Sequence, residues 1–144
     1  RVSAPARGPG DGTHRVDGGG LDLEGGADLR LRYRNGPPLL VECKNVLRVP
    51  SKRFNLPRMD FQRTRASKGD PCSRYYAPTD FDIIAGCLHA VTERWEFRYA
   101  LPWALDPHKA CAGKIASNVI LDERWQDDPR PAFEAASARL VSTT

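Results

Sequence analysis

Two short strand-like segments joined by a tight turn most strongly constrain how this chain can fold. Residues 26–33 and 38–45 are rich in strand-forming apolar side chains, and the Arg-Asn-Gly-Pro sequence at 34–37 is typical of a turn between antiparallel strands. Because successive side chains of a strand point to opposite faces, Glu42 and Lys44 lie on one face of the second strand. Charged groups on an otherwise apolar strand are costly to bury unless something pairs with them. The hairpin therefore predicts a polar cluster on one face of a β-sheet.

A third charged residue, Asp28, stands near the start of the first strand. Paired with the second strand, it would complete a cluster of two carboxylates and one ammonium group, which suits a hard divalent cation and a water molecule. The alternative is an edge hairpin whose exposed face carries Glu42 and Lys44 as an ordinary ion pair, worth about 0.5 kcal/mol.

The spacing Asp-(x)13-Glu-x-Lys, from Asp28 to Lys44, resembles the catalytic motif of the PD-(D/E)xK nucleases, the restriction-endonuclease-like superfamily. Ala27 stands where that family often has proline. The resemblance extends over residues 21–125, because the order strand, strand, helix, strand also follows along the chain. It implies an α/β fold with a mixed central β-sheet flanked by helices, built on an αβββαβ core. The first helix of that core is not recognisable before residue 21.

The same resemblance implies a role for each matching residue. Asp28 and Glu42 become ligands of Mg²⁺, for which Mn²⁺ is a substitute, and the backbone carbonyl of Cys43 is a further ligand. Lys44 becomes the lysine that orients or activates the attacking water. Gln62 is expected to face the active site from the following helix, with a plain surface amide as the alternative.

The remaining segments are predicted from hydrophobic periodicity and from helix and turn signals. Residues 1–20 form a flexible, Gly- and Pro-rich lead-in, and residues 21–144 form the nuclease-like domain. Within that domain we expect a first strand at 21–26 carrying Asp22 and Glu24, a helix at 55–68, strands at 81–91, 95–101 and 119–121, and a helix at 131–140. The chain begins with Arg1, which is consistent with a fragment of a longer protein.

A basic segment follows Lys44 and is interleaved with aromatic residues. Cationic side chains displace counterions from a phosphate backbone, and aromatic rings pack on sugars or exposed bases. The expected DNA-binding residues are Arg48, Lys52, Arg53, Arg63, Arg65, Lys68 and Arg74. The alternative is a solvated helix face beside a basic loop. RNA stays an alternative ligand because phosphate contacts carry no sugar identity, and a homodimer is expected if both strands are cut.

Cysteine usage and hydropathy predict a cytoplasmic protein. The four cysteines (Cys43, Cys72, Cys87 and Cys111) are widely spaced, so we expect reduced thiols rather than a disulfide framework. A zinc site built from Cys87-x-His89 and His108-x-x-Cys111 is a weaker alternative, because neither pair has finger or ribbon spacing. No run approaches the roughly 20 apolar residues of a membrane span, and no signal peptide is visible.

The sequence thus predicts a metal-dependent endonuclease that hydrolyses DNA phosphodiester bonds. Two other classes of protein remain open at this point. One is a non-catalytic nucleic-acid-binding module on the same fold, and the other is an interaction domain of a larger protein.

Overall fold

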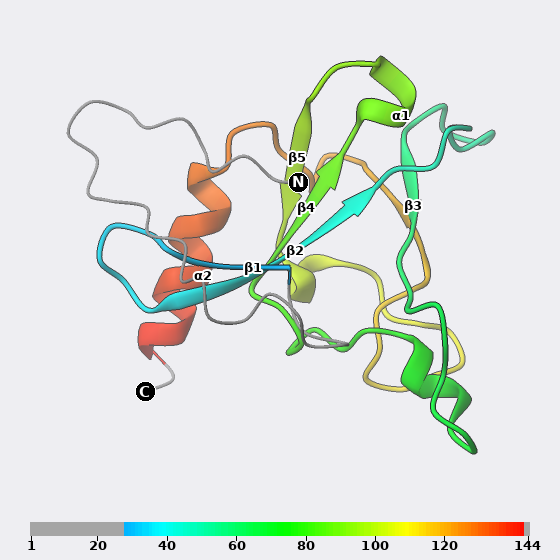
Figure 1. Ribbon diagram of the computed structural model, residues 1–144, viewed down its shortest axis with the longest axis horizontal. Coiled ribbons are helices and arrows are strands. Elements are labelled where there is room, and N and C mark those ends of the chain that lie inside the picture. The colour runs from blue at the N-terminus through cyan, green and yellow to red at the C-terminus, as the bar shows by residue number, and fades with distance from the viewer. Residues whose placement is uncertain (1–27, 143–144) are drawn as a thin grey trace.

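A four-stranded mixed β-sheet forms the centre of the protein in a computed structural model that describes residues 28–142 (Figure 1). Its strands are β1 (Leu29–Arg32), β2 (Pro38–Asn45), β4 (Ile83–Cys87) and β5 (Phe97–Ala100), in the spatial order β1-β2-β4-β5. Strands β2 and β4 are parallel, whereas β1 and β5 run antiparallel to their neighbours. The predicted mixed central sheet is therefore confirmed. The predicted lead-in, the strand at 21–26, and Asp22 and Glu24 lie outside the described residues.

The predicted hairpin is present as β1 and β2. Arg34 and Asn35 at its tip both have left-handed backbone angles, with φ of 48° and 60°. Gly36 N–H donates a hydrogen bond of 2.9 Å to the carbonyl oxygen of Tyr33 and closes the turn. Two consecutive left-handed residues give the turn a twist that matches the right-handed twist of the flanking strands.

The two faces of the sheet are covered by different structures. Helix α2 (Arg130–Ser142), which confirms the predicted terminal helix, packs Phe133 and Ala136 against Leu39 and Ile83 on one face. The opposite face is covered by a separate antiparallel ribbon of β3 (Arg58–Asp60) and β6 (Asn118–Ile120) and by the loops around it. Figure 1 shows α2 and β3 on opposite sides of the sheet.

The predicted helix at 55–68 is wrong, because this segment contains β3 followed by irregular backbone. Met59 and Phe61 are both fully buried, so the apolar period is two and not 3.6. Main-chain pairing with the β6 segment, including a 2.6 Å hydrogen bond from Phe61 N–H to the Ser117 carbonyl, replaces helical bonds. Asn55 is left-handed, with φ of 52°, and Ala66 is exposed.

The other predicted elements are present with different lengths. The predicted strand at 81–91 ends at Cys87, because the chain turns through the short helix α1 (His89–Thr92) to pair β5 with β4. The predicted strands at 95–101 and 119–121 correspond to β5 and β6. Two 3-10 helices, η1 (Pro71–Arg74) and η2 (Pro102–Ala104), complete the regular structure. Between residues 28 and 142, no helix has the length and apolar character needed to cross a membrane.

Candidate active site

Asp28 and Glu42 are brought together by the register of the hairpin. Strand β1 pairs Leu29 with Val41, so the next position outward sets Asp28 across from Glu42. Directly opposed residues of an antiparallel pair point to the same face. The Oδ2 atom of Asp28 accepts a 2.9 Å hydrogen bond from the backbone N–H of Cys43, which ties the end of β1 to β2. The predicted pair of carboxylates is therefore present in the structure.

Glu42 is a buried carboxylate with an unsatisfied oxygen. Only 6% of the residue is exposed, and it is the one charged residue that is buried among residues 28–142. Its Oε2 atom is 3.4 Å from the hydroxyl of Tyr76, which donates a hydrogen bond, while Oε1 is buried without a hydrogen-bond partner. Burial, followed by the negative charge of Asp28, raises the pKa of Glu42 to about 7, and the positive charge of Lys44 opposes this rise.

Lys44 lies on the same face, at the end of β2. Its Nζ atom donates a 3.2 Å hydrogen bond to the main-chain carbonyl of Gln62 and lies 5.4 Å from the centre of the Tyr76 ring. Since Lys44 also acts electrostatically on Glu42, the three residues form one cluster of two carboxylates and an ammonium group. The structure thus brings Asp28, Glu42 and Lys44 together, as predicted.

Tyr76 was not among the predicted site residues. It is buried beside Glu42, with its ring 4.6 Å from that of Phe61. Burial and the negative charge of Glu42 raise the pKa of Tyr76 to about 12, so its hydroxyl remains a hydrogen-bond donor at neutral pH. In the sequence, Tyr76 belongs to a Tyr-Tyr pair inside the basic segment. That setting indicated a contact with nucleic acid and not a buried position beside Glu42.

Arg63 is half-buried and packs against Tyr76. Its guanidinium lies 4.5 Å from the centre of the Tyr76 ring and donates to the carbonyl oxygens of Ser73 and Tyr75. It also forms a 3.3 Å ion pair with Asp80. Four protein contacts therefore engage this side chain, which was predicted to contact DNA.

Two other predicted site residues contribute only their backbone. The Gln62 side chain donates a 2.8 Å hydrogen bond to Asp60, while its carbonyl accepts the bond from Lys44. The prediction that the Gln62 side chain faces the active site is therefore wrong, because its amide points to Asp60 and not to Asp28 or Glu42. The Cys43 side chain packs with the cluster under α2, on the other face of the sheet, so only its backbone is available to the site.

The remaining predicted DNA-binding residues do not share a helix. Arg48, Lys52 and Arg53 lie exposed on the loop after β2. The others, Arg65, Lys68 and Arg74, are also exposed and lie between β3 and β4. The helix face of the alternative is absent, and these six cations lie on two segments that are exposed to solvent.

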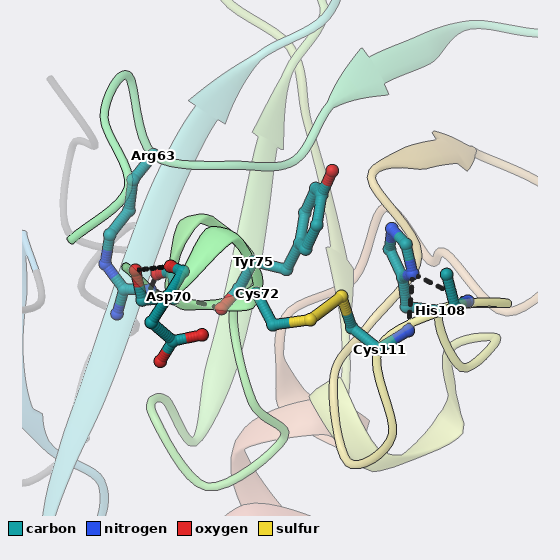
Figure 2. Close-up of a disulfide and its surroundings, with 8 residues drawn as sticks. Arg63, Asp70, Cys72, Tyr75, His108 and Cys111 are labelled. Carbon is teal, nitrogen blue, oxygen red and sulfur yellow. Dashed lines mark hydrogen bonds between the residues drawn. A yellow bond between two sulfur atoms is a disulfide. The ribbon is translucent and has the colours of Figure 1, made fainter. Parts of the chain in front are cut away.

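Two of the cysteines form a disulfide, which corrects the expectation of four reduced thiols. Cys72 in η1 is bonded to Cys111, with 5.7 Å between their Cα atoms and a sequence separation of 39 (Figure 2). Contacts between the two loops bring the sulfur atoms together, including a tilted contact of the Tyr75 and His108 rings, whose centres are 4.1 Å apart. Such a contact is not visible in cysteine spacing. Cys43 and Cys87 are free, as expected.

The predicted zinc alternative is not supported by this arrangement. Cys111 is consumed by the disulfide, and His108 Nδ1 accepts hydrogen bonds from the backbone N–H groups of Ala110 and Cys111 (Figure 2). Within the described part of the chain, no group of three or more His, Cys, Asp or Glu side chains is placed to hold a metal ion. Among the described residues, Asp28 and Glu42 are thus the two carboxylates that a cation at this place would meet.

A cavity beside β6 is separate from the carboxylate pair. Its walls include Phe54, Asn118 and Arg124, and Arg124 is held there by ion pairs with Asp106 and Asp122 at 3.0 and 2.8 Å. None of Asp28, Glu42 and Lys44 lines it. Arg124 and the two aspartates thus satisfy one another, in contrast to Glu42 Oε1.

Comparison with protein-family models, with curated protein sequences and with solved structures finds no match to this chain. A functional proposal therefore rests on the geometry of the site.

The coupling between the carboxylates gives a direct prediction. We expect Asp28→Asn to lower the pKa of Glu42, because a neutral amide removes the nearby negative charge. Carboxyl ¹³C chemical shifts followed through a pH titration would measure this change. Asp127→Asn, an exposed residue after the β6 strand, is the matched control and should leave the pKa of Glu42 unchanged. An unchanged pKa in Asp28→Asn would mean that the two carboxylates do not interact.

Proposed function

We propose that the protein is a metal-dependent endonuclease that hydrolyses DNA phosphodiester bonds at Asp28, Glu42 and Lys44. One observation carries this proposal. A buried carboxylate with a free oxygen faces a second carboxylate, and a lysine lies two residues further along the same strand. Two carboxylates and a buried, unsatisfied oxygen are unfavourable unless a proton or a cation neutralises the charge.

The residues present fit a hard divalent cation such as Mg²⁺ or Mn²⁺. Mg²⁺ commonly takes one or two protein carboxylates and completes its coordination with waters and substrate phosphate oxygens. Asp28 and Glu42 would supply those carboxylates, with the Cys43 carbonyl as a further oxygen. The buried Oε1 atom of Glu42 would then gain the partner it lacks. Cation binding would also lower the pKa of Glu42 from its raised value.

Each residue of the site has a distinct task in the proposed reaction. When bound, the cation polarises the scissile phosphate and lowers the pKa of a coordinated water. The ammonium group of Lys44 holds the attacking water or stabilises the negative charge that develops on the phosphate. The Gln62 carbonyl restrains Lys44, and the hydroxyl of Tyr76 orients Glu42 through Oε2.

The topology supports the proposed kinship with restriction-endonuclease-like proteins. A hairpin carries Asp28 at the start of one strand and Glu42 and Lys44 on the next, and the chain then crosses to β4, parallel to β2. The chain differs from the family in the segment between β2 and β4, which contains β3 and η1 where the family has a helix. This departure favours a second candidate, a non-catalytic nucleic-acid-binding module on the same fold.

Plasmid cleavage by Lys44→Ala tests the proposal. We expect the unaltered protein to nick or linearise supercoiled DNA with Mg²⁺ or Mn²⁺ but not with EDTA. Loss of the ammonium group should slow cleavage by about 10²- to 10³-fold, the usual effect of removing a group that stabilises transition-state charge. The matched control is Lys109→Ala, which removes an exposed lysine on the loop after η2.

Full activity of Lys44→Ala would refute the assigned site. Absence of cleavage by the unaltered protein with either metal, together with a retarded DNA band at low salt, would favour the binding module. Absence of both cleavage and DNA binding in a folded sample would favour an interaction domain.

A further inference from the structure

Exposed apolar side chains are concentrated on two segments of the surface. Of the five large apolar residues exposed between residues 28 and 142, only Val141 is on α2. The other four are Val49, Phe54, Val91 and Trp95, with Phe54 52% and Trp95 69% exposed. They lie in the loop at 46–57, which follows β2, and in the turn at 89–96, which follows β4. Exposed apolar side chains that are grouped rather than scattered commonly mark binding sites.

Both segments leave the same end of the sheet. Strands β2 and β4 are parallel and end as a pair, with Asn45 opposite Cys87. A 3.0 Å hydrogen bond from Val46 N–H to the Cys87 carbonyl joins the start of the loop to the end of β4. Figure 1 shows the loop after β2 and the turn containing α1 beyond this end of the sheet. Lys44 is the next-to-last residue of β2, so the proposed active site borders the same end.

The two aromatic rings are held in place although they are exposed. Trp95 stacks on His89, with ring centres 4.2 Å apart and an angle of 26° between the planes. The guanidinium of Arg53 lies 5.0 Å from the centre of the Phe54 ring. Hydrogen bonds from Leu88 N–H to the Glu96 carbonyl and from Ser51 N–H to the Leu56 carbonyl close the two segments at their bases. Each segment therefore presents one flat ring to solvent.

The charge of the loop at 46–57 is suited to a polyanion. The loop at 46–57 carries Arg48, Lys52 and Arg53 and no acidic residue, and all three cations are exposed. A purely apolar protein partner would not require this charge. Flat aromatic rings beside cations are how proteins bind single-stranded nucleic acids, because unpaired bases stack on the rings while the phosphates contact Arg and Lys. In a duplex the base faces are already stacked on one another.

We propose that the loop at 46–57 and the turn at 89–96 form a docking platform for single-stranded DNA. The choice of DNA rests on the proposed nuclease function. The platform would make the preferred substrate one with an unpaired segment beside the scissile bond. Bases stack on Trp95 and Phe54, and phosphates contact Arg48, Lys52 and Arg53.

Binding measured without metal tests this platform. Fluorescence anisotropy in EDTA would compare a labelled oligothymidine of about 15 nucleotides, an oligouridine and a duplex of the same length. We expect the oligothymidine to bind most tightly and to quench tryptophan fluorescence. Phe54→Ala with Trp95→Ala should weaken oligothymidine binding by about 10- to 100-fold and abolish the quenching, while duplex binding changes less. Trp95→Phe should retain most of the affinity, and Val141→Ala is the control on α2.

Three results would overturn the platform. They are unchanged oligothymidine affinity in the folded double variant, tighter binding of the duplex by the unaltered protein, and no binding of any of the three probes. Tighter binding of oligouridine would assign the platform to RNA and overturn the DNA assignment. Because no cleavage is measured, failure of the nuclease proposal leaves this result intact. Conversely, cleavage that depends on Lys44 together with unchanged binding in the double variant would refute only the platform.

Discussion

Glu42→Gln is expected to abolish metal-dependent cleavage and, in the metal-free protein, to increase the free energy of unfolding at alkaline pH. The loss of cleavage follows because a neutral amide cannot neutralise the cation that the proposed reaction requires. The gain in stability follows because the substitution removes a negative charge that is buried next to Asp28. A structural residue without a catalytic role would affect stability alone, so the two effects together identify a functional carboxylate.

The sign of the stability change is fixed by the direction of the pKa shift. Folding raises the pKa of Glu42 from 4.5 to about 7. Between these two values the folded state binds a proton that the unfolded state does not, so the contribution of Glu42 to stability is lost as the pH rises from 4.5 to 7. The full pKa shift corresponds to about 3 kcal/mol in the free energy of unfolding. Because Asp28 is exposed, solvent screens its charge, and we expect a loss of about 2 kcal/mol.

Urea unfolding in EDTA measures this effect. The difference between Glu42→Gln and the unaltered protein should be small near pH 4.5 and should reach about 2 kcal/mol above pH 7. Glu123 is an exposed residue after β6, and the stability difference between Glu123→Gln and the unaltered protein should not increase with pH. Added Mg²⁺ should stabilise the unaltered protein and not Glu42→Gln. A variant that cleaves DNA normally, or whose stability difference does not change with pH, would contradict this account of Glu42.

The hairpin and its charged cluster were predictable because they depend on local sequence. The turn at 34–37 fixes the register, and the register sets Asp28 opposite Glu42. The two-residue period of a strand then places Lys44 on the same face as Glu42. No long-range contact is needed for any of these steps.

Long-range contacts explain what the sequence did not reveal. The segment at 55–68 carries helix signals, but pairing of β3 with β6 overrides them, and that pairing joins residues about 60 positions apart. Tyr76 reaches Glu42 from 34 residues away, and the crossover that places it has no regular pattern. The bond between Cys72 and Cys111 likewise depends on how two irregular loops pack.

Reduction of the disulfide between Cys72 and Cys111 is expected to lower the free energy of unfolding by about 3–4 kcal/mol. The bond closes a loop with a sequence separation of 39, and a loop of that length strongly restricts the unfolded chain. Chemical unfolding with and without dithiothreitol would measure the loss. Cys72→Ala with Cys111→Ala should be destabilised to a similar extent and should no longer respond to dithiothreitol.

The disulfide also bears on the site, because it anchors the segment that carries Tyr76. Cys72 lies in η1, and the carbonyl groups of Ser73 and Tyr75 next to it hold Arg63 against the Tyr76 ring. On the other side of the bond, Ile115 N–H donates a 2.7 Å hydrogen bond to the Tyr76 carbonyl. Loss of the bond should therefore loosen the hydroxyl that orients Glu42.

Cleavage should fall in the reduced protein even where it remains folded, and Tyr76→Phe should reproduce part of that loss without any response to dithiothreitol. Equal cleavage by the oxidised and reduced proteins would show that the disulfide stabilises the fold without holding the site.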